Sequence, residues 1–162
     1  MTLWVDGKPY FLDYREKAPA AATSTMYLNA DGSLVPGQSL SGSLAAGVPG
    51  TVAGMWEAHR KFGRLSWAQV LAPAIGYARN GFIAYATAKP ASDPRRANFN
   101  RYFGGKMVKG ELFRQPELAA TLQRISDNGR GEFYAGRTAD LLVAQMDRSG
   151  GLVSRNDLKD YA

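Results

Sequence analysis

The chain has 162 residues, 45% of them hydrophobic, and a formal net charge of +6, which suits one globular domain with a sizeable core. It has no cysteine, which excludes disulfides and thiol catalysis, and its single histidine, His59, argues against a histidine-based metal site. No apolar run approaches the roughly 20 residues of a membrane span, and the first residues lack the basic region and apolar stretch of a signal peptide.

The first 35 residues are predicted to form short strands. Asp6-Gly7 separates the apolar run Leu3–Val5 from the alternating run Tyr10–Tyr14, and Asp-Gly between two such runs is typical of a tight hairpin turn. A second short hairpin is predicted around Asn29–Gly32. The first hairpin would leave Arg15 near the end of a strand, which is a common place for a residue that contacts a ligand.

Arg15 is the candidate ligand-binding residue of this region. An arginine side chain is always charged and presents its donors in a plane that matches a carboxylate bidentately. The alternative is an ordinary surface ion pair with Asp13 or Glu16, which would stabilise the fold little. One arginine is a weak signal, so the residues by themselves leave both interpretations open.

Residues 47–162 are predicted to be mainly helical. Apolar side chains recur there at three- and four-residue spacing, and glycines follow the segments. Ser154 with Asp157 fits a capping box for a last short helix, and Glu132–Gly136 is expected to be a turn. His59 is expected to be a core or boundary residue rather than a catalytic one. The predicted apolar faces lie at Val52–Phe62, Trp67–Ala78, Leu118–Ile125 and Ala139–Met146, with a short helix near Tyr85–Ala91.

The basic stretch Asp93–Arg114 is expected to be irregular. It holds six basic and two acidic residues and so carries +4 of the net charge, with Phe99, Tyr102 and Phe103 between the charges. Phosphate attraction and base stacking would suit such a stretch to nucleic acid. A solvated loop anchored by its aromatic side chains is the alternative that we favour, because no nucleic-acid-binding motif accompanies the charge.

No catalytic group of residues emerges from the sequence. A Ser-His-Asp triad would need His59, and no serine lies in a G-x-S-x-G motif. The glycines of Gly47–Gly54 would allow close backbone approach or a helix N-terminus open to an anion, but the GK[ST] ending of a phosphate loop is missing. The residues therefore predict an α+β, mainly α, domain over 1–162, with one or two short hairpins at 1–35 followed by a helical region at 47–162.

Four stretches resemble gamma-glutamyltranspeptidases, in the order in which that family has them. Arg130 stands where the family usually has proline, and the basic stretch is the least matched part. The four stretches are LDYREKAPAAA from Leu12, GVPGTVAG from Gly47, LAPAIGYARNGF from Leu71 and the tail from Gly129 to Tyr161 with its FYAG, GGL and NDLKDY segments.

The resemblance implies a piece of an αββα N-terminal-nucleophile hydrolase. In that family a precursor cuts itself into two subunits, and the new N-terminal threonine of the small subunit attacks the gamma-glutamyl amide of glutathione or a related donor. The acyl group then passes to water, an amino acid or a peptide. This chain would be an internal fragment of the large subunit and a single incomplete domain. It would contain no catalytic residue, no cofactor and no metal, and it would be inactive alone.

One functional residue carries over from the family. Arg15 resembles the arginine that pairs with the alpha-carboxylate of the gamma-glutamyl group, which would select the donor and hold the scissile amide in register. The partners that the resemblance implies are the gamma-glutamyl donor and the small subunit of the same precursor. Bacterial members of the family are usually periplasmic or extracellular, so we expect the same here.

Three alternatives stay open at this point. A cephalosporin or glutaryl acylase shares the family type but takes a different acyl group. A small basic module that binds nucleic acid through Asp93–Arg114 is the rival from another class. The third is a purely structural interaction piece, in which helix faces cut from a larger protein would expose apolar surface and favour self-association.

Overall fold

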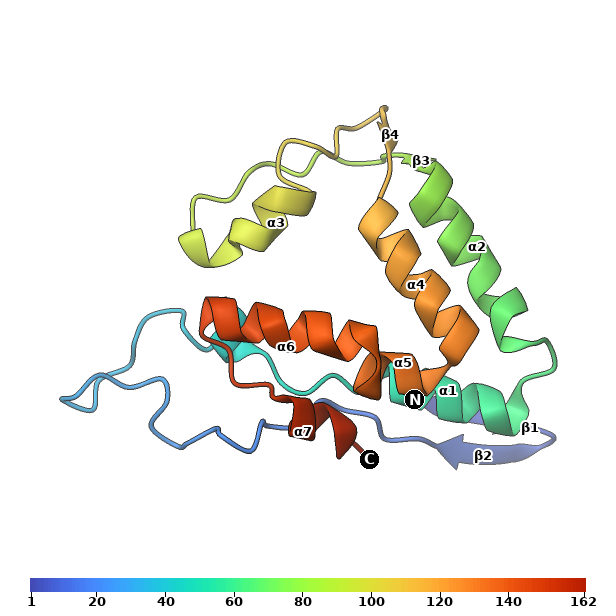
Figure 1. Cartoon of the computed structure of the whole chain (residues 1–162), viewed down its shortest axis with the longest axis horizontal. Helices are drawn as coiled ribbons and strands as arrows, with labels where there is room; N and C mark the ends of the chain where they lie inside the picture. The colour runs from blue at the N-terminus through green and yellow to red at the C-terminus, as the bar shows by residue number, and fades with distance from the viewer. The chain divides into compact units, whose positions relative to one another are not determined.

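The computed structural model describes all residues, 1–162, and they form two compact units. Unit 1 comprises Met1–Trp67 and Asn128–Ala162, and unit 2 comprises Ala68–Asp127. Helices dominate both units, and each unit holds one two-stranded sheet (Figure 1). The expected α+β, mainly α, fold class is confirmed. None of the helices has the length and apolar character that crossing a bilayer requires.

Unit 1 begins with the predicted hairpin. Strands β1 (Thr2–Val5) and β2 (Lys8–Phe11) pair antiparallel, with Thr2 opposite Phe11. Asp6 and Gly7 both have positive φ, 50° and 75°, as the two central residues of a tight hairpin turn require. The second strand ends at Phe11, earlier than the alternating run to Tyr14 predicted.

The second predicted hairpin is reduced to a single bridge. Leu28 pairs antiparallel with Leu34, and the Gly32 N–H donates to the Asn29 carbonyl at 3.0 Å to close the turn between them. The bridge is too short to form a strand. The remaining loop up to residue 50 holds only a turn of 3-10 helix, η1 (Ser43–Ala45).

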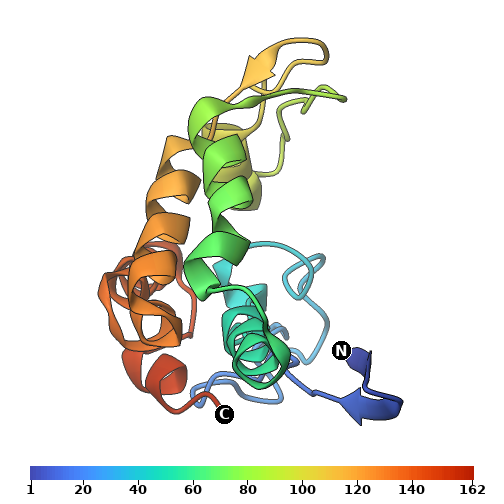
Figure 2. The same cartoon turned by 90° about the vertical axis from the view of Figure 1, so that its right-hand side faces the viewer.

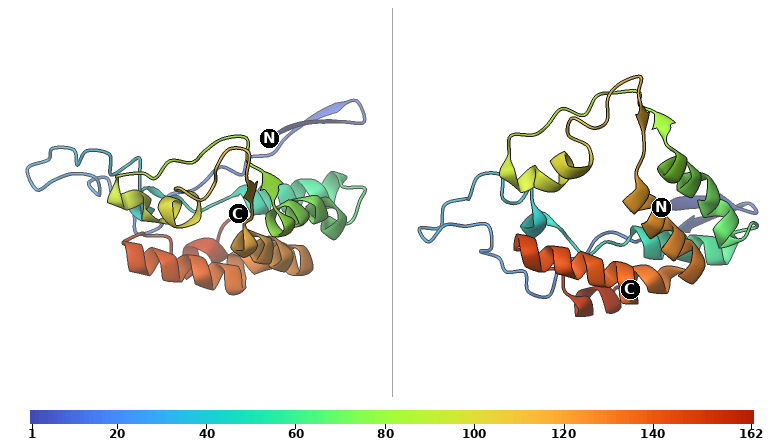
Figure 3. Two further views of the ribbon diagram at one scale, coloured as in Figure 1. Left: turned by 90° about the horizontal axis from the view of Figure 1, so that it is seen from above. Right: turned by 45° about the horizontal axis from the view of Figure 1, so that its top comes forward.

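The core of unit 1 lies where the C-terminal helices meet the loop before α1. Figure 3 shows α7 beside α6, and the buried cluster there joins residues from distant parts of the sequence. The helices of unit 1 are α1 (Thr51–Phe62), α5 (Arg130–Ala135), α6 (Arg137–Ser149) and α7 (Arg155–Lys159). The cluster contains Val48, Tyr134, Ala139, Val153, Leu158 and Tyr161.

Residues 132–136, expected to be a turn, are mostly helical, so that prediction is wrong. Residues 132–135 belong to α5, a helix of six residues that Gly136 ends and that follows Gly129, whose φ is 64°. A helix this short leaves no apolar repeat in the sequence, and tertiary packing of Tyr134 is what stabilises it. Arg130 takes the first helical position, where proline is equally well accommodated, which explains how either residue suits this site.

Unit 2 is built on two helices that lie side by side in Figures 1 and 2. Helix α2 (Trp67–Asn80) passes through Pro73 without being split, and α4 (Pro116–Asn128) starts with proline, which suits the first position of a helix. The Gln115 N–H donates to the Ala78 carbonyl at 2.8 Å, and Arg79 Nη2 donates to Gln123 Oε1 at 3.1 Å.

The segment between α2 and α4 differs from its prediction. The short helix expected at residues 85–91 is absent. Its backbone groups form hydrogen bonds with a distant segment instead: the Ala88 N–H donates to the Met107 carbonyl at 2.8 Å. Residues 93–114, expected to be irregular, include a turn of 3-10 helix and then an α-helix. The Asp93 side chain caps the 3-10 turn by accepting from the Arg95 N–H. The elements of this segment are β3 (Phe82–Ile83), η2 (Pro94–Arg96), α3 (Ala97–Tyr102) and β4 (Leu112–Phe113), with β3 and β4 antiparallel.

Candidate functional site

Arg15 lies in a loop of unit 1 that is fixed on both sides of it. The Asp13 carboxylate accepts a hydrogen bond from the Arg15 N–H at 3.0 Å, a local turn that competes with continuation of the strand. Two residues later, Lys17 forms an antiparallel bridge with Val48 through two backbone hydrogen bonds of 2.8 and 3.3 Å. Arg15 therefore sits four residues beyond the end of β2, on a backbone held against the segment before α1.

Glycines make that close approach possible. A Cβ on Gly50 would overlap the Tyr14 carbonyl and the Tyr161 hydroxyl, and a Cβ on Gly54 would overlap the Tyr14 ring. A Cβ on Gly47 would be in tight contact, at 3.1 Å, with the Glu16 side chain and the Lys17 carbonyl. Of the two roles predicted for these glycines, close approach of two backbone segments is the one seen, at Gly47 and Gly50, whereas Gly54 makes room for the Tyr14 ring.

Two stacked tyrosines from the C-terminal part of unit 1 form hydrogen bonds to the Arg15 loop and to the segment around the start of α1. The Tyr161 hydroxyl donates to the Arg15 carbonyl at 2.8 Å, and its ring stacks on Tyr134 with centroids 5.6 Å apart and planes at 19°. The Tyr134 hydroxyl donates to the Pro49 carbonyl at 2.7 Å and accepts from the Ala53 N–H at 3.2 Å. Burial raises the pKa of both hydroxyls, so both stay protonated donors at neutral pH.

The Arg15 side chain itself faces solvent at the edge of an open depression of about 700 Å³. The depression lies between residues 11–16 and 46–51 of unit 1, including Asp13, Glu16, Gly50 and Thr51. The Arg15 side chain is 81% exposed, and its guanidinium pairs with the Glu16 carboxylate, on a side chain that is 58% exposed, at a long 3.5 Å. The surface ion pair considered from the sequence is thus present, and it leaves most of the guanidinium donors available.

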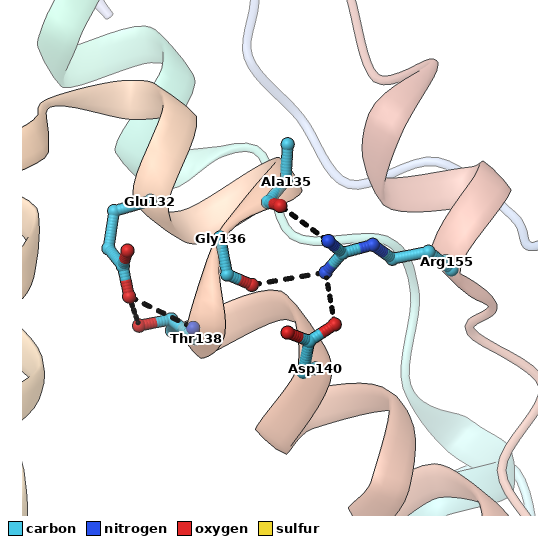
Figure 4. A network of polar contacts seen from close by, with 6 residues as sticks. All are labelled: Glu132, Ala135, Gly136, Thr138, Asp140 and Arg155. Atoms are coloured by element: carbon cyan, nitrogen blue, oxygen red, sulfur yellow. Dashed lines mark hydrogen bonds and ion pairs between the residues drawn. The ribbon is translucent and has the colours of Figure 1, made fainter.

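A second network holds the helices that carry the tyrosines (Figure 4). Arg155 of α7 donates to the carbonyls of Ala135 and Gly136 and pairs with Asp140 of α6 at 2.8 Å. The buried Glu132 carboxylate accepts from the N–H and hydroxyl of Thr138 at 3.0 and 2.9 Å. These contacts satisfy backbone groups where α5 ends and α6 begins, so the network is structural.

His59 has the expected boundary position. Its Nε2 lies 2.9 Å from the Leu65 carbonyl, which can only accept, and its ring meets Trp67 edge-on with centroids 5.1 Å apart. No group of three or more His, Cys, Asp or Glu side chains converges on a point where a metal ion would fit.

The sequence indicated Arg15 and the glycines but missed Tyr134 and Tyr161 as part of the same site. Tyr161 is 146 positions away from Arg15, and no local pattern reports a contact at that separation. The tyrosines were visible only as members of the tail motif from Gly129 to Tyr161.

Comparisons with known proteins agree over the whole chain. The family model described as gamma-glutamyltranspeptidase matches residues 1–162. A glutathione hydrolase proenzyme from Pseudomonas aeruginosa is 55% identical over 99% of this chain, and the chain spans 30% of that relative's length.

Solved structures give the same result. A gamma-glutamyltranspeptidase from Pseudomonas nitroreducens, solved with L-DON, matches with a TM-score of 0.89 and 54% identity, over 99% of this chain and 50% of that one. A cephalosporin acylase from Bacillus halodurans matches with a TM-score of 0.79 and 27% identity, over 99% of this chain and 32% of that one.

Proposed function

Because the chain belongs to the gamma-glutamyltranspeptidase family, we propose that it is the part of a glutathione hydrolase that grips the donor's alpha-carboxylate. Its helices and short hairpins are part of the family's αββα N-terminal-nucleophile hydrolase fold. The parent enzyme cleaves the gamma-glutamyl amide of glutathione and related donors and transfers the acyl group to water, amino acids or peptides. The nucleophile comes from the rest of that protein.

The observation that supports this proposal best is that Arg15 has a fixed backbone and a largely available guanidinium. Its backbone is fixed through Asp13, Lys17 and Tyr161, whereas its guanidinium has one long ion pair and borders an open depression. A fixed backbone with an available planar fork suits bidentate binding of a carboxylate. The Glu16 contact at 3.5 Å is one that a substrate carboxylate can replace.

The comparisons with known proteins also favour one acyl group for the donor. Identity is twice as high to the glutathione hydrolase and gamma-glutamyltranspeptidase as to the cephalosporin acylase, so a gamma-glutamyl donor is favoured over a glutaryl one. A nucleic-acid module has no support beyond the charge of the basic stretch, and the family match extends across that stretch.

The partner and the compartment are also proposals. The relative is named a proenzyme, and this chain spans less than a third of it, so a second subunit from the same precursor would complete the depression beside Arg15. We expect the parent to act in the periplasm or outside the cell, as is usual for bacterial members of the family.

The test uses the full-length parent enzyme. Arg15→Ala removes a charge-assisted contact worth about 1.5–3 kcal/mol, so the KM for a gamma-glutamyl anilide should rise roughly 10- to 100-fold. Arg15→Lys should recover only part of that loss, because an ammonium lacks the fork. Arg64→Ala, in the exposed loop after α1, is the matched control and should leave KM unchanged. Unchanged kinetics in Arg15→Ala would remove Arg15 from the site, and turnover by the 162-residue chain alone would contradict the placement of the nucleophile elsewhere.

A further inference from the structure

The side chain of Tyr161 reaches from the end of unit 1 to the backbone of the candidate binding residue. Its hydroxyl donates to the Arg15 carbonyl at 2.8 Å, and the residue is only 5% exposed. No other hydrogen bond to that carbonyl is seen in the structure. The orientation of the Arg15 peptide therefore depends on a side chain that does not face the depression.

Tyr161 is itself held from three sides. Its ring stacks on Tyr134, which is 2% exposed, and Lys17 Nζ lies 5.5 Å from the centroid of the Tyr161 ring. Arg130 donates to the Tyr161 carbonyl, and its guanidinium lies 4.8 Å from the centroid of the Tyr134 ring. These contacts hold the ring in one place, so the Tyr161 hydroxyl offers the Arg15 carbonyl a donor at a defined position.

The same stack holds the facing segment. The Tyr134 hydroxyl bridges the Pro49 carbonyl and the Ala53 N–H at the start of α1. The two tyrosines thus connect the two segments that border the depression, residues 11–16 and 46–51, through partly buried hydrogen bonds. An error of about 1 Å in the position of a binding group is enough to weaken a contact of this kind strongly.

We infer that Tyr161 is a positioning residue for donor binding, which acts by fixing the Arg15 backbone through its hydroxyl. This inference rests on the proposed function, because it assigns to Tyr161 a role only through Arg15. Tyr134 and Arg130 support Tyr161 in this role, Tyr134 through the stacked ring and Arg130 through its hydrogen bond to the Tyr161 carbonyl.

The test is Tyr161→Phe in the full-length parent enzyme. The ring and its stack remain, and only the hydrogen bond to Arg15 is lost, so the KM for a gamma-glutamyl anilide should rise about three- to tenfold while kcat changes less than twofold. Tyr27→Phe is the matched control: its hydroxyl also donates to a backbone carbonyl, that of Leu44 at 3.2 Å, and it should leave KM unchanged.

A double-mutant cycle separates positioning from a general loss of structure. In an Arg15→Ala background, Tyr161→Phe should have no further effect on KM, because the group that it positions is gone. An equal effect in both backgrounds, or none in the wild-type background, would overturn the inference. If Arg15→Ala itself leaves KM unchanged, the proposed function fails instead.

Arg130→Ala gives an independent check should Tyr161→Phe fail to assemble. It releases the Tyr161 carbonyl and keeps the hydroxyl, so KM should rise, though by less than in Tyr161→Phe, and only when Arg15 is present. No change in KM with Arg15 present would count against Tyr161 as a positioning residue.

Discussion

At the scale of single residues, the candidate site depends on the missing Cβ atoms of its glycines as well as on the guanidinium of Arg15. Residues 14–17 lie so close to residues 47–54 that a Cβ would overlap their atoms at Gly50 and Gly54 and would be in tight contact with them at Gly47. The sequence predicted close backbone approach as one of two roles for these glycines, because glycine lacks a Cβ. It could not reveal that Tyr14 is the neighbour of Gly54, since that contact depends on the tertiary fold.

We predict that Gly54→Ala destabilises the chain. Alanine favours a helix by about 1 kcal/mol over glycine, but its Cβ would overlap the root of the Tyr14 ring, which cannot move aside as a flexible chain end could. Overpacking of this kind costs about 1–3 kcal/mol net, which urea unfolding would measure as a lower midpoint.

Gly76→Ala is the matched control for that substitution. Gly76 lies in α2 with nothing within 4 Å of the added Cβ, so alanine there should raise the unfolding free energy by up to about 1 kcal/mol. Equal effects at both positions would show that the Tyr14 contact does not decide the result.

At the scale of elements, α7 is tied to the Arg15 loop as well as to its neighbours. The predicted capping box is confirmed: the Ser154 side chain accepts from the Asp157 N–H, and the Asp157 carboxylate accepts from the Ser154 N–H at 2.8 Å. The same carboxylate accepts from the Ala20 N–H at 2.8 Å, which no local pattern could have indicated.

This arrangement makes stability depend on pH. Desolvation by itself would raise the pKa of Asp157, but hydrogen bonds from Ser154 and Ala20 together outweigh it, so the pKa lies below its usual value. A depressed folded-state pKa contributes stability above the unfolded value, near 4, and that stability is lost as the pH falls through the folded value. We predict that Asp157→Asn lowers the unfolding free energy at pH 7 and that the difference from wild type shrinks below about pH 4. A constant difference across this range would contradict the assignment.

The β1–β2 hairpin places two large aromatic side chains on one face. Thr2 pairs with Phe11 and Trp4 with Pro9, so Trp4 and Phe11 share the side opposite Tyr10, and both are largely exposed. Tyr10 on the other face meets Phe62 of α1 with ring centroids 4.8 Å apart. An exposed apolar face on a two-stranded sheet with open edges favours self-association.

We therefore predict that the 162-residue chain self-associates through this hairpin. Its mass by light scattering should rise with concentration, and Trp4→Ser combined with Phe11→Ser should lower that rise. Tyr85→Ser, which removes an exposed aromatic side chain from unit 2, is the control and should leave the association unchanged. A monomer at all concentrations would refute the prediction.

At the scale of the whole molecule, the long helices were the predictable part. The helices α1, α2, α4 and α6 carry enough apolar repeats for their pattern to be read, and proline or glycine marks their ends. The short elements α3, α5, β3 and β4 have too few residues for a period, and each depends on packing or on pairing with a distant segment.

Charge is also distributed unevenly between the two units. Unit 2 contains nine basic and four acidic residues and so carries +5 of the net +6, whereas unit 1 is nearly neutral. The net charge of unit 1 therefore offers an anionic donor little attraction, and the selectivity proposed for Arg15 rests on the local geometry of its loop.

The most direct test of the account compares two donors in the full-length parent enzyme. A gamma-glutamyl anilide and a 4-aminobutanoyl anilide differ only in the alpha-carboxylate. We predict that the wild-type enzyme prefers the first donor at least 10-fold in kcat/KM and that Arg15→Ala removes most of this preference, because the lost contact is with that carboxylate alone. A preference that Arg15→Ala leaves intact would contradict the account.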